Sequence, residues 1–106
     1  GGDLHIHHQR EPALRGRQLV YVKSWGPLEA ANDTPAELRH WCLDQASLSD
    51  SPRAKVMHCL PVRRGVVIAG DVLDSERSIV SDQAENRLWA QAALIELLAR
   101  RHGGLS

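Results

Sequence analysis

The chain has 106 residues, with 13 basic and 13 acidic side chains and therefore a formal net charge of zero. This length suits one small domain, and a balanced charge argues against nucleic acid or a membrane surface as the partner. No apolar run reaches the length of a membrane span or a signal peptide, which predicts a cytoplasmic protein. Two cysteines, Cys42 and Cys59, are too few for a disulfide framework. Because the chain begins at Gly1 rather than Met, we expect it to be part of a longer protein.

The first quarter of the chain predicts two strands and a helical turn. Residues 3–7 alternate polar and apolar side chains, which favours a strand. Residues 12–15 fit one helical turn that Gly16 ends. The β-branched and aromatic residues 19–22 predict a buried strand, and the Ser-Trp-Gly-Pro stretch at 24–27 predicts a loop.

A helix is predicted over 34–44. Thr34 can cap its free amides, Pro35 suits the first helical position, and Glu37 completes a capping box. The polar stretch 47–52 then predicts a loop. We expect the helix to direct three side chains inward: Leu38, Trp41 and Cys42.

The middle of the chain adds two predicted strands. Residues 55–60 form a buried strand that Pro61 ends, residues 71–74 a short helical turn, and residues 78–80 a third short strand. Strands that alternate with helices predict an α/β fold with a parallel sheet.

The longest predicted element is a helix that Asp82 caps, with Glu85 three residues further on. Basic residues 100–102 suit the negative end of its dipole, and Gly103 ends it. Its apolar stripe consists of Ala84, Leu88, Ala92, Ile95 and Ala99.

Three polar stretches follow predicted strands or begin the last helix: 23–26, 58–64 and 82–87. Ligands of open parallel sheets bind at the carboxyl ends of the strands. The sequence therefore predicts a binding site where these stretches converge.

Two of these stretches resemble the C-terminal signature of the ornithine carbamoyltransferase family. They are Met-His-Cys-Leu-Pro at 57–61 and Asp-Gln-Ala-Glu-Asn-Arg-Leu at 82–88, and the resemblance extends from Tyr21 to near the end of the chain. Val-Arg-Arg at 62–64 and Lys-Ser-Trp-Gly at 23–26 favour the branch of the family that acts on N-acylated ornithine. N-acetylornithine is the favoured acceptor, with N-succinylornithine and ornithine left as alternatives. Some members carry a lysine where Val67 stands, so any contribution from that lysine is absent here.

The resemblance implies an α/β three-layer sandwich with a mainly parallel sheet, as in the Rossmann-like second domain of a carbamoyltransferase. Residues 1–81 would be part of the ornithine-binding domain, and residues 82–106 a C-terminal helix that returns to the carbamoyl-phosphate domain. That other domain is missing, since the chain has no Ser-Thr-Arg-Thr loop. We therefore expect the isolated chain to be inactive, and the intact enzyme to be a homotrimer without a cofactor.

The implied reaction moves the carbamoyl group of carbamoyl phosphate to the δ-amine of N-acetylornithine, giving N-acetylcitrulline and phosphate in arginine biosynthesis. By resemblance, Cys59 is catalytic, and Cys59, Leu60 and Arg87 bind carbamoyl phosphate. Lys23 and Leu60 bind the amino-acid substrate, Lys23 through the α-carboxylate. The family pattern also implies a cis peptide bond between Leu60 and Pro61.

Each of these residues also has a simpler interpretation. Cys59 fits a small buried apolar residue, Arg87 a helix-face arginine, and Lys23 a solvated loop lysine. His5, His7 and His8 lack nearby cysteines and a fourth ligand, so we predict no metal site. A non-catalytic amino-acid-binding module and a decayed fragment remain alternative functions.

Overall fold

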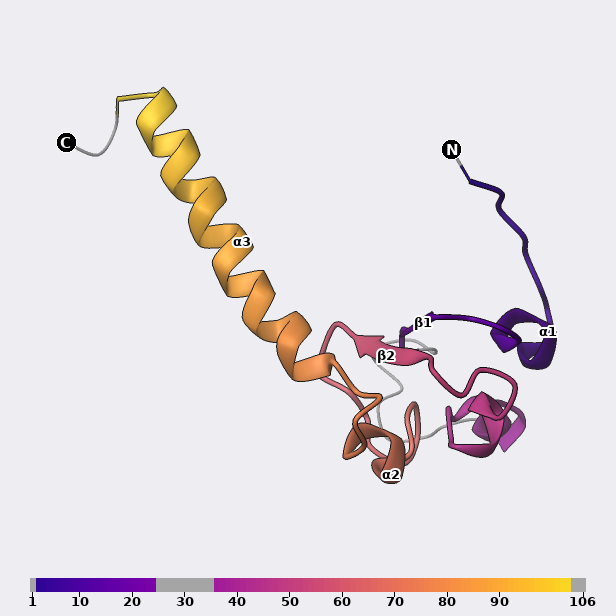
Figure 1. The fold of residues 1–106 in the computed structure, drawn as a ribbon. Coiled ribbons are helices and arrows are strands. Elements are labelled where there is room, and N and C mark those ends of the chain that lie inside the picture. The colour runs from indigo at the N-terminus through magenta and orange to yellow at the C-terminus, as the bar shows by residue number, and fades with distance from the viewer. Residues whose placement is uncertain (1, 25–35, 104–106) are drawn as a thin grey trace.

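The computed structural model describes residues 2–24 and 36–103. The elements are α1 (Arg10–Leu14), β1 (Leu19–Val22), the 3₁₀ helices η2 (Ala36–Trp41) and η3 (Ala46–Leu48), β2 (Lys55–His58), α2 (Gly70–Leu73) and α3 (Val80–Arg101). Figure 1 shows α3 extending away from the other elements. The radius of gyration is accordingly 17.5 Å, against about 13 Å for a compact domain of this length.

The sheet consists of β1 and β2, which pair in parallel with Leu19 opposite Lys55 and Val22 opposite His58. The predicted α/β class with a parallel sheet is confirmed. The third predicted strand, 78–80, is wrong, because only Ser78 forms a bridge, to Val56, and α3 begins at Val80.

The hydrophobic core lies around β2 and the segments that follow it. Val56 at its centre is fully buried between β1 and the stretch 77–79, which leads from α2 into α3. Burial of these aliphatic side chains provides the main stabilisation of the fold. The buried apolar residues are Val20, Leu43, Leu48, Ala54, Val56, Val67, Ile68, Val72 and Val80.

The N-terminal segment differs from its prediction at one end and agrees at the other. Residues 3–7 form no strand. Leu4 and Ile6 are 85% and 77% exposed, because the alternation of polar and apolar residues does not by itself supply a neighbouring strand. The predicted helical turn is confirmed as α1, and Gly16 follows it with φ 69°. The buried Ser51 hydroxyl holds this segment, donating to the Leu14 carbonyl at 2.5 Å.

The predicted helix over 34–44 is a shorter 3₁₀ helix, η2, and Thr34 and Pro35 lie outside the described residues. Leu43 explains the early end: its N–H donates to the Val67 carbonyl at 2.9 Å, and its carbonyl accepts from Ala69 N–H at 2.8 Å. The three expected inner side chains are only half-buried, whereas Leu43 is buried. The predicted loop 47–52 contains part of η3, whose Leu48 is a core residue.

The last helix begins three residues earlier than predicted, at Val80 rather than after Asp82. Its N-cap is Ile79, which makes no side-chain cap hydrogen bond, and Asp82 lies inside the first turn. Ile79 is fixed instead by its N–H, which donates to the Val56 carbonyl at 3.0 Å. The helix ends as predicted, with φ 64° at Gly103.

Most of α3 is exposed within the part of the chain that the structure describes. Leu88, Ile95 and Leu98 are 61%, 63% and 45% exposed, although apolar side chains of this size are usually buried. None of the described helices is long and apolar enough to span a membrane.

Candidate active site

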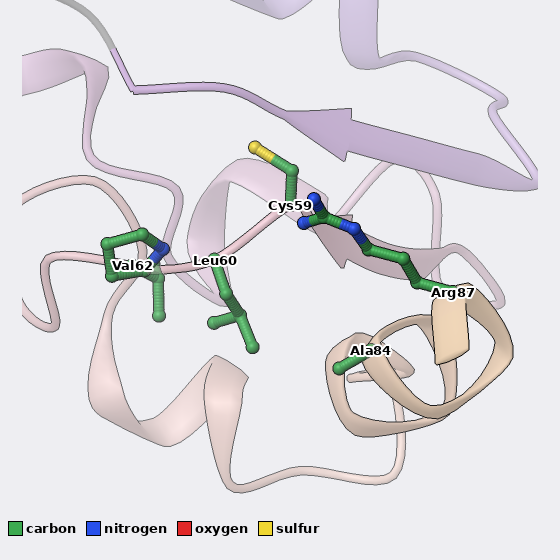
Figure 2. Close-up of a pocket in the computed structure, with 6 residues that line it drawn as sticks. Cys59, Leu60, Val62, Ala84 and Arg87 are labelled. Carbon is green, nitrogen blue, oxygen red and sulfur yellow. The ribbon is translucent and has the colours of Figure 1, made fainter. Parts of the chain in front are cut away.

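A pocket of about 220 Å³ lies between the end of β2 and the beginning of α3. His58, Cys59, Leu60, Gln83, Ala84 and Arg87 line it, and an adjoining hollow adds Pro61 and Val62. Figure 2 shows the Arg87 side chain extending from α3 toward the segment that carries Cys59 and Leu60. The structure thus brings the two sequence motifs together, as predicted from the strand ends.

The backbone at Leu60 has an unusual geometry. The Leu60–Pro61 peptide bond is cis, which confirms the prediction, and Leu60 has φ 50°. A leucine in the left-handed region is uncommon and persists only where its surroundings hold it. One such restraint is the Leu60 N–H, which donates to His58 Nδ1 at 2.9 Å.

His58 is the buried polar centre of the site, with 1% exposure. Its backbone N–H donates to Gln83 Oε1 of α3 at 3.0 Å. Its ring Nε2 lies 3.3 Å from the Ser24 hydroxyl oxygen. Because Nδ1 accepts from Leu60, the neutral ring carries its proton on Nε2 and donates it to Ser24.

Burial lowers the pKa of His58 below its ordinary value of 6.5, and the positive charge of Lys23 lowers it further. The folded chain therefore binds a proton here less readily than the unfolded chain does.

We expect the free energy of unfolding to fall as pH drops below about 6.5, because the unfolded chain then gains a proton that folded His58 resists. The stability that neutral His58 contributes is fully present above that pH. Urea unfolding at a series of pH values from 7.5 to 5 measures the slope. His58→Asn, which has no titrating ring, should show a shallower slope; an equal slope in both proteins would contradict the prediction.

Tyr21 of β1 lies beside Cys59. A hydrogen bond with the Cys59 side chain raises the pKa of the Tyr21 hydroxyl. Desolvation raises the same pKa further, by a smaller amount. The tyrosine is therefore neutral at physiological pH, and Cys59 itself is exposed at the pocket rather than a buried apolar residue.

Arg87 lines the pocket from α3. Since the helix begins at Val80, Arg87 stands beyond the first turn, where the helix dipole contributes little. An anion bound beside Arg87 would be recognised by the planar guanidinium itself. Glu85 does not cap the helix, because its Oε1 accepts from Trp89 Nε1 at 3.3 Å.

Lys23 follows β1 at the same edge of the sheet, since Val22 is opposite His58 in the register. It does not line the pocket itself, so its role as a ligand for a carboxylate stays a prediction. Trp25 and Gly26 of the same loop lie outside the described residues. Val67, at the position where some family members have lysine, is fully buried in the core.

Sequence reasoning missed His58, Gln83 and Ala84 as residues that build the pocket. All three lie inside the motifs quoted above, which are the available signal for them. Over residues 2–24 and 36–103, no three His, Cys, Asp or Glu side chains are grouped so as to hold a metal ion.

The parallel strands, the turn at Leu60 and the cationic side chain opposite it define an α/β domain with a ligand pocket at the carboxyl end of its sheet. The family model described as "Aspartate/ornithine carbamoyltransferase, Asp/Orn binding domain" matches residues 1–98. The chain belongs to this family of carbamoyltransferases.

Relatives and solved structures agree with this assignment. The chain is 35% identical to an N-acetylornithine carbamoyltransferase of Xanthomonas axonopodis pv. citri, over 97% of this chain and 32% of the relative. It is 41% identical to the ornithine carbamoyltransferase of Bordetella pertussis, over 81% of this chain and 29% of the relative.

Among solved structures, ornithine carbamoyltransferase from Pyrococcus furiosus superposes with a TM-score of 0.76 at 34% identity, covering 93% of this chain and 32% of that one. Acetylornithine transcarbamylase complexed with acetylcitrulline gives 0.71 at 35% identity, covering 83% and 28%. The chain thus spans about a third of the length of these relatives.

Proposed function

We propose that this chain supplies the amino-acid-binding part of a carbamoyltransferase that transfers the carbamoyl group of carbamoyl phosphate to the δ-amine of N-acetylornithine. The observation that carries the proposal is the convergence of Cys59, Leu60 and Arg87 on one pocket. The similarity to enzymes named for N-acetylornithine supports this acceptor.

In the proposed reaction, the δ-amine attacks the carbonyl carbon of carbamoyl phosphate. The bond from that carbon to the bridging oxygen breaks, phosphate leaves with the electron pair, and the amine nitrogen loses its proton. Catalysis then depends on positioning the reactants and on stabilising the charge that develops on oxygen. Arg87 supplies the planar cationic donor, and the carbonyls of Cys59 and Leu60 accept from the carbamoyl amide and the incoming amine.

Lys23 pairs with the α-carboxylate of the acceptor in this proposal. Acylation removes the α-amino charge of ornithine, so a single cation matches the remaining carboxylate. The position of Lys23 beyond β1, at the sheet edge that carries His58, supports this assignment.

The rest of the enzyme is proposed to lie outside this chain. Residues 82–106 would return to a carbamoyl-phosphate domain, and the intact enzyme would be a cytoplasmic homotrimer of arginine biosynthesis. The exposed apolar side chains of α3, among them Leu88, Ile95 and Leu98, support a covered helix in the whole assembly.

A chimaera tests the proposal. Residues 1–98 replace the matching segment of the Xanthomonas axonopodis enzyme, and carbamoyl transfer is measured with N-acetylornithine, N-succinylornithine and ornithine; the 106-residue chain alone serves as the control. We expect transfer to N-acetylornithine by the chimaera and none by the isolated chain. Preference for ornithine or N-succinylornithine would overturn the acceptor assignment. A folded but inactive chimaera would favour a non-catalytic amino-acid-binding module.

A further inference from the structure

Three segments in and beside the pocket meet at a single residue, His58. Its backbone N–H bonds to Gln83 at the start of α3, its Nδ1 accepts from Leu60 N–H, and its Nε2 bonds to Ser24 in the loop after β1. These segments carry Arg87, Leu60 and Lys23 respectively. The ring is 1% exposed, so water offers no substitute for either ring hydrogen bond.

We propose that neutral His58 is a positioning residue, which holds Leu60 in its left-handed conformation and ties the Lys23–Ser24 loop to the same point. The kinetic part of this inference deepens the proposed function and rests on it; the structural part does not. His58 touches no reacting atom in the proposal. It acts through the backbone of Leu60, whose φ of 50° a leucine does not adopt without restraint.

The restraint depends on the protonation state of the ring. A protonated imidazole is a donor at both nitrogens, so Nδ1 would face the Leu60 N–H as donor against donor. The charged and titratable groups nearby are Lys23 after β1, Cys59 next in the chain, and Arg87 of α3. Burial and the positive charge of Lys23 oppose protonation of His58. Lowering the pH is therefore expected to break the hydrogen bond from Leu60 N–H to His58 Nδ1 and so to weaken the restraint on Leu60.

Two near-isosteric variants separate the ring nitrogens. His58→Asn places an amide oxygen close to the position of Nδ1, and so keeps an acceptor for Leu60 without a titrating group. His58→Gln places its polar atoms near the position of Nε2, and so keeps a partner for Ser24 while it loses the acceptor for Leu60. Ser24→Ala is the matched control that removes only the outer hydrogen bond.

The first measurement is nuclear magnetic resonance of the 106-residue chain without ligand. We expect a His58 ring with Nδ1 unprotonated at pH 7.5, and a Leu60 amide whose hydrogen exchange speeds up by about two- to tenfold in His58→Gln but not in His58→Asn or Ser24→Ala. An Nδ1-protonated tautomer, or equal Leu60 exchange in all four proteins, would overturn the proposal.

The second measurement is the pH profile of carbamoyl transfer in the active chimaera. His58→Gln should lower kcat/KM at every pH by more than His58→Asn does, and His58→Asn should lose the acidic fall that His58 contributes. A profile unchanged by His58→Asn would overturn the kinetic part. If the chimaera with His58 intact is inactive, the proposed function fails, while the Leu60 exchange result still decides the structural part.

Discussion

Arg87→Ala is expected to lower kcat/KM of the active chimaera by about 10²- to 10³-fold, the usual effect of removing one donor from a developing oxyanion. The guanidinium is the cationic side chain that lines both parts of the pocket opposite Cys59 and Leu60. Steady-state kinetics with carbamoyl phosphate and N-acetylornithine measure the effect.

Two further variants make this test specific. Arg87→Lys keeps the charge and loses the planar fork, so its activity should lie between that of the Arg87 protein and Arg87→Ala. Arg101→Ala removes an exposed arginine at the far end of the same helix and should leave kcat/KM unchanged. Equal activities for Arg87→Ala and Arg101→Ala would remove Arg87 from the site.

Ile68→Ala is expected to lower the free energy of unfolding by about 2–5 kcal/mol, because it removes buried methyl and methylene groups and leaves a cavity. Ile68 is fully buried and packs in the cluster that contains Val56 and Leu43. A domain of this size has few kcal/mol in reserve, so the variant comes close to unfolding. Urea denaturation followed by circular dichroism measures the change.

Ile68→Val extends the measurement to a milder change, with an expected loss of about 0.5–1.5 kcal/mol. Ile95→Ala makes the same chemical change as Ile68→Ala on the exposed face of α3, where Ile95 is 63% exposed. Its effect should stay within about 0.5 kcal/mol. A loss at Ile95 as large as that at Ile68 would show that α3 is covered in solution, contrary to the described fold.

The sequence predicted the parts of the fold that depend on local pattern. The strand 19–22 and the C-terminal end of α3 at Gly103 follow from side-chain type and glycine placement, and both are confirmed. The expected burial of the strand was wrong for Leu19 and Tyr21, which are about half exposed. The cis bond at Pro61 followed from family resemblance, because nothing in local propensity selects it.

Two misplaced helix boundaries, the start of α3 and the end of η2, share one physical cause, which is hydrogen bonding to distant segments. Ile79 begins α3 without a capping side chain because Val56 accepts its N–H, and Leu43 ends η2 because Val67 and Ala69 pair with it. No window of neighbouring residues contains that information. The structural roles of His58 and Gln83 could not be predicted for the same reason, because they depend on a hydrogen bond between residues 25 positions apart in the chain.

The long helix has unequal support along its length. Its first turns are anchored by buried Val80 and by Gln83, whereas beyond them the described side chains are held mainly by neighbours on the helix, such as Arg100 bonding to Glu96. A helix supported only by its own turns frays from its free end. Amide exchange along α3 should therefore quicken steadily toward Arg101, and melting should proceed from that end. The pocket lies at the anchored, N-terminal end of α3, so we expect its geometry to persist while the distal turns unwind.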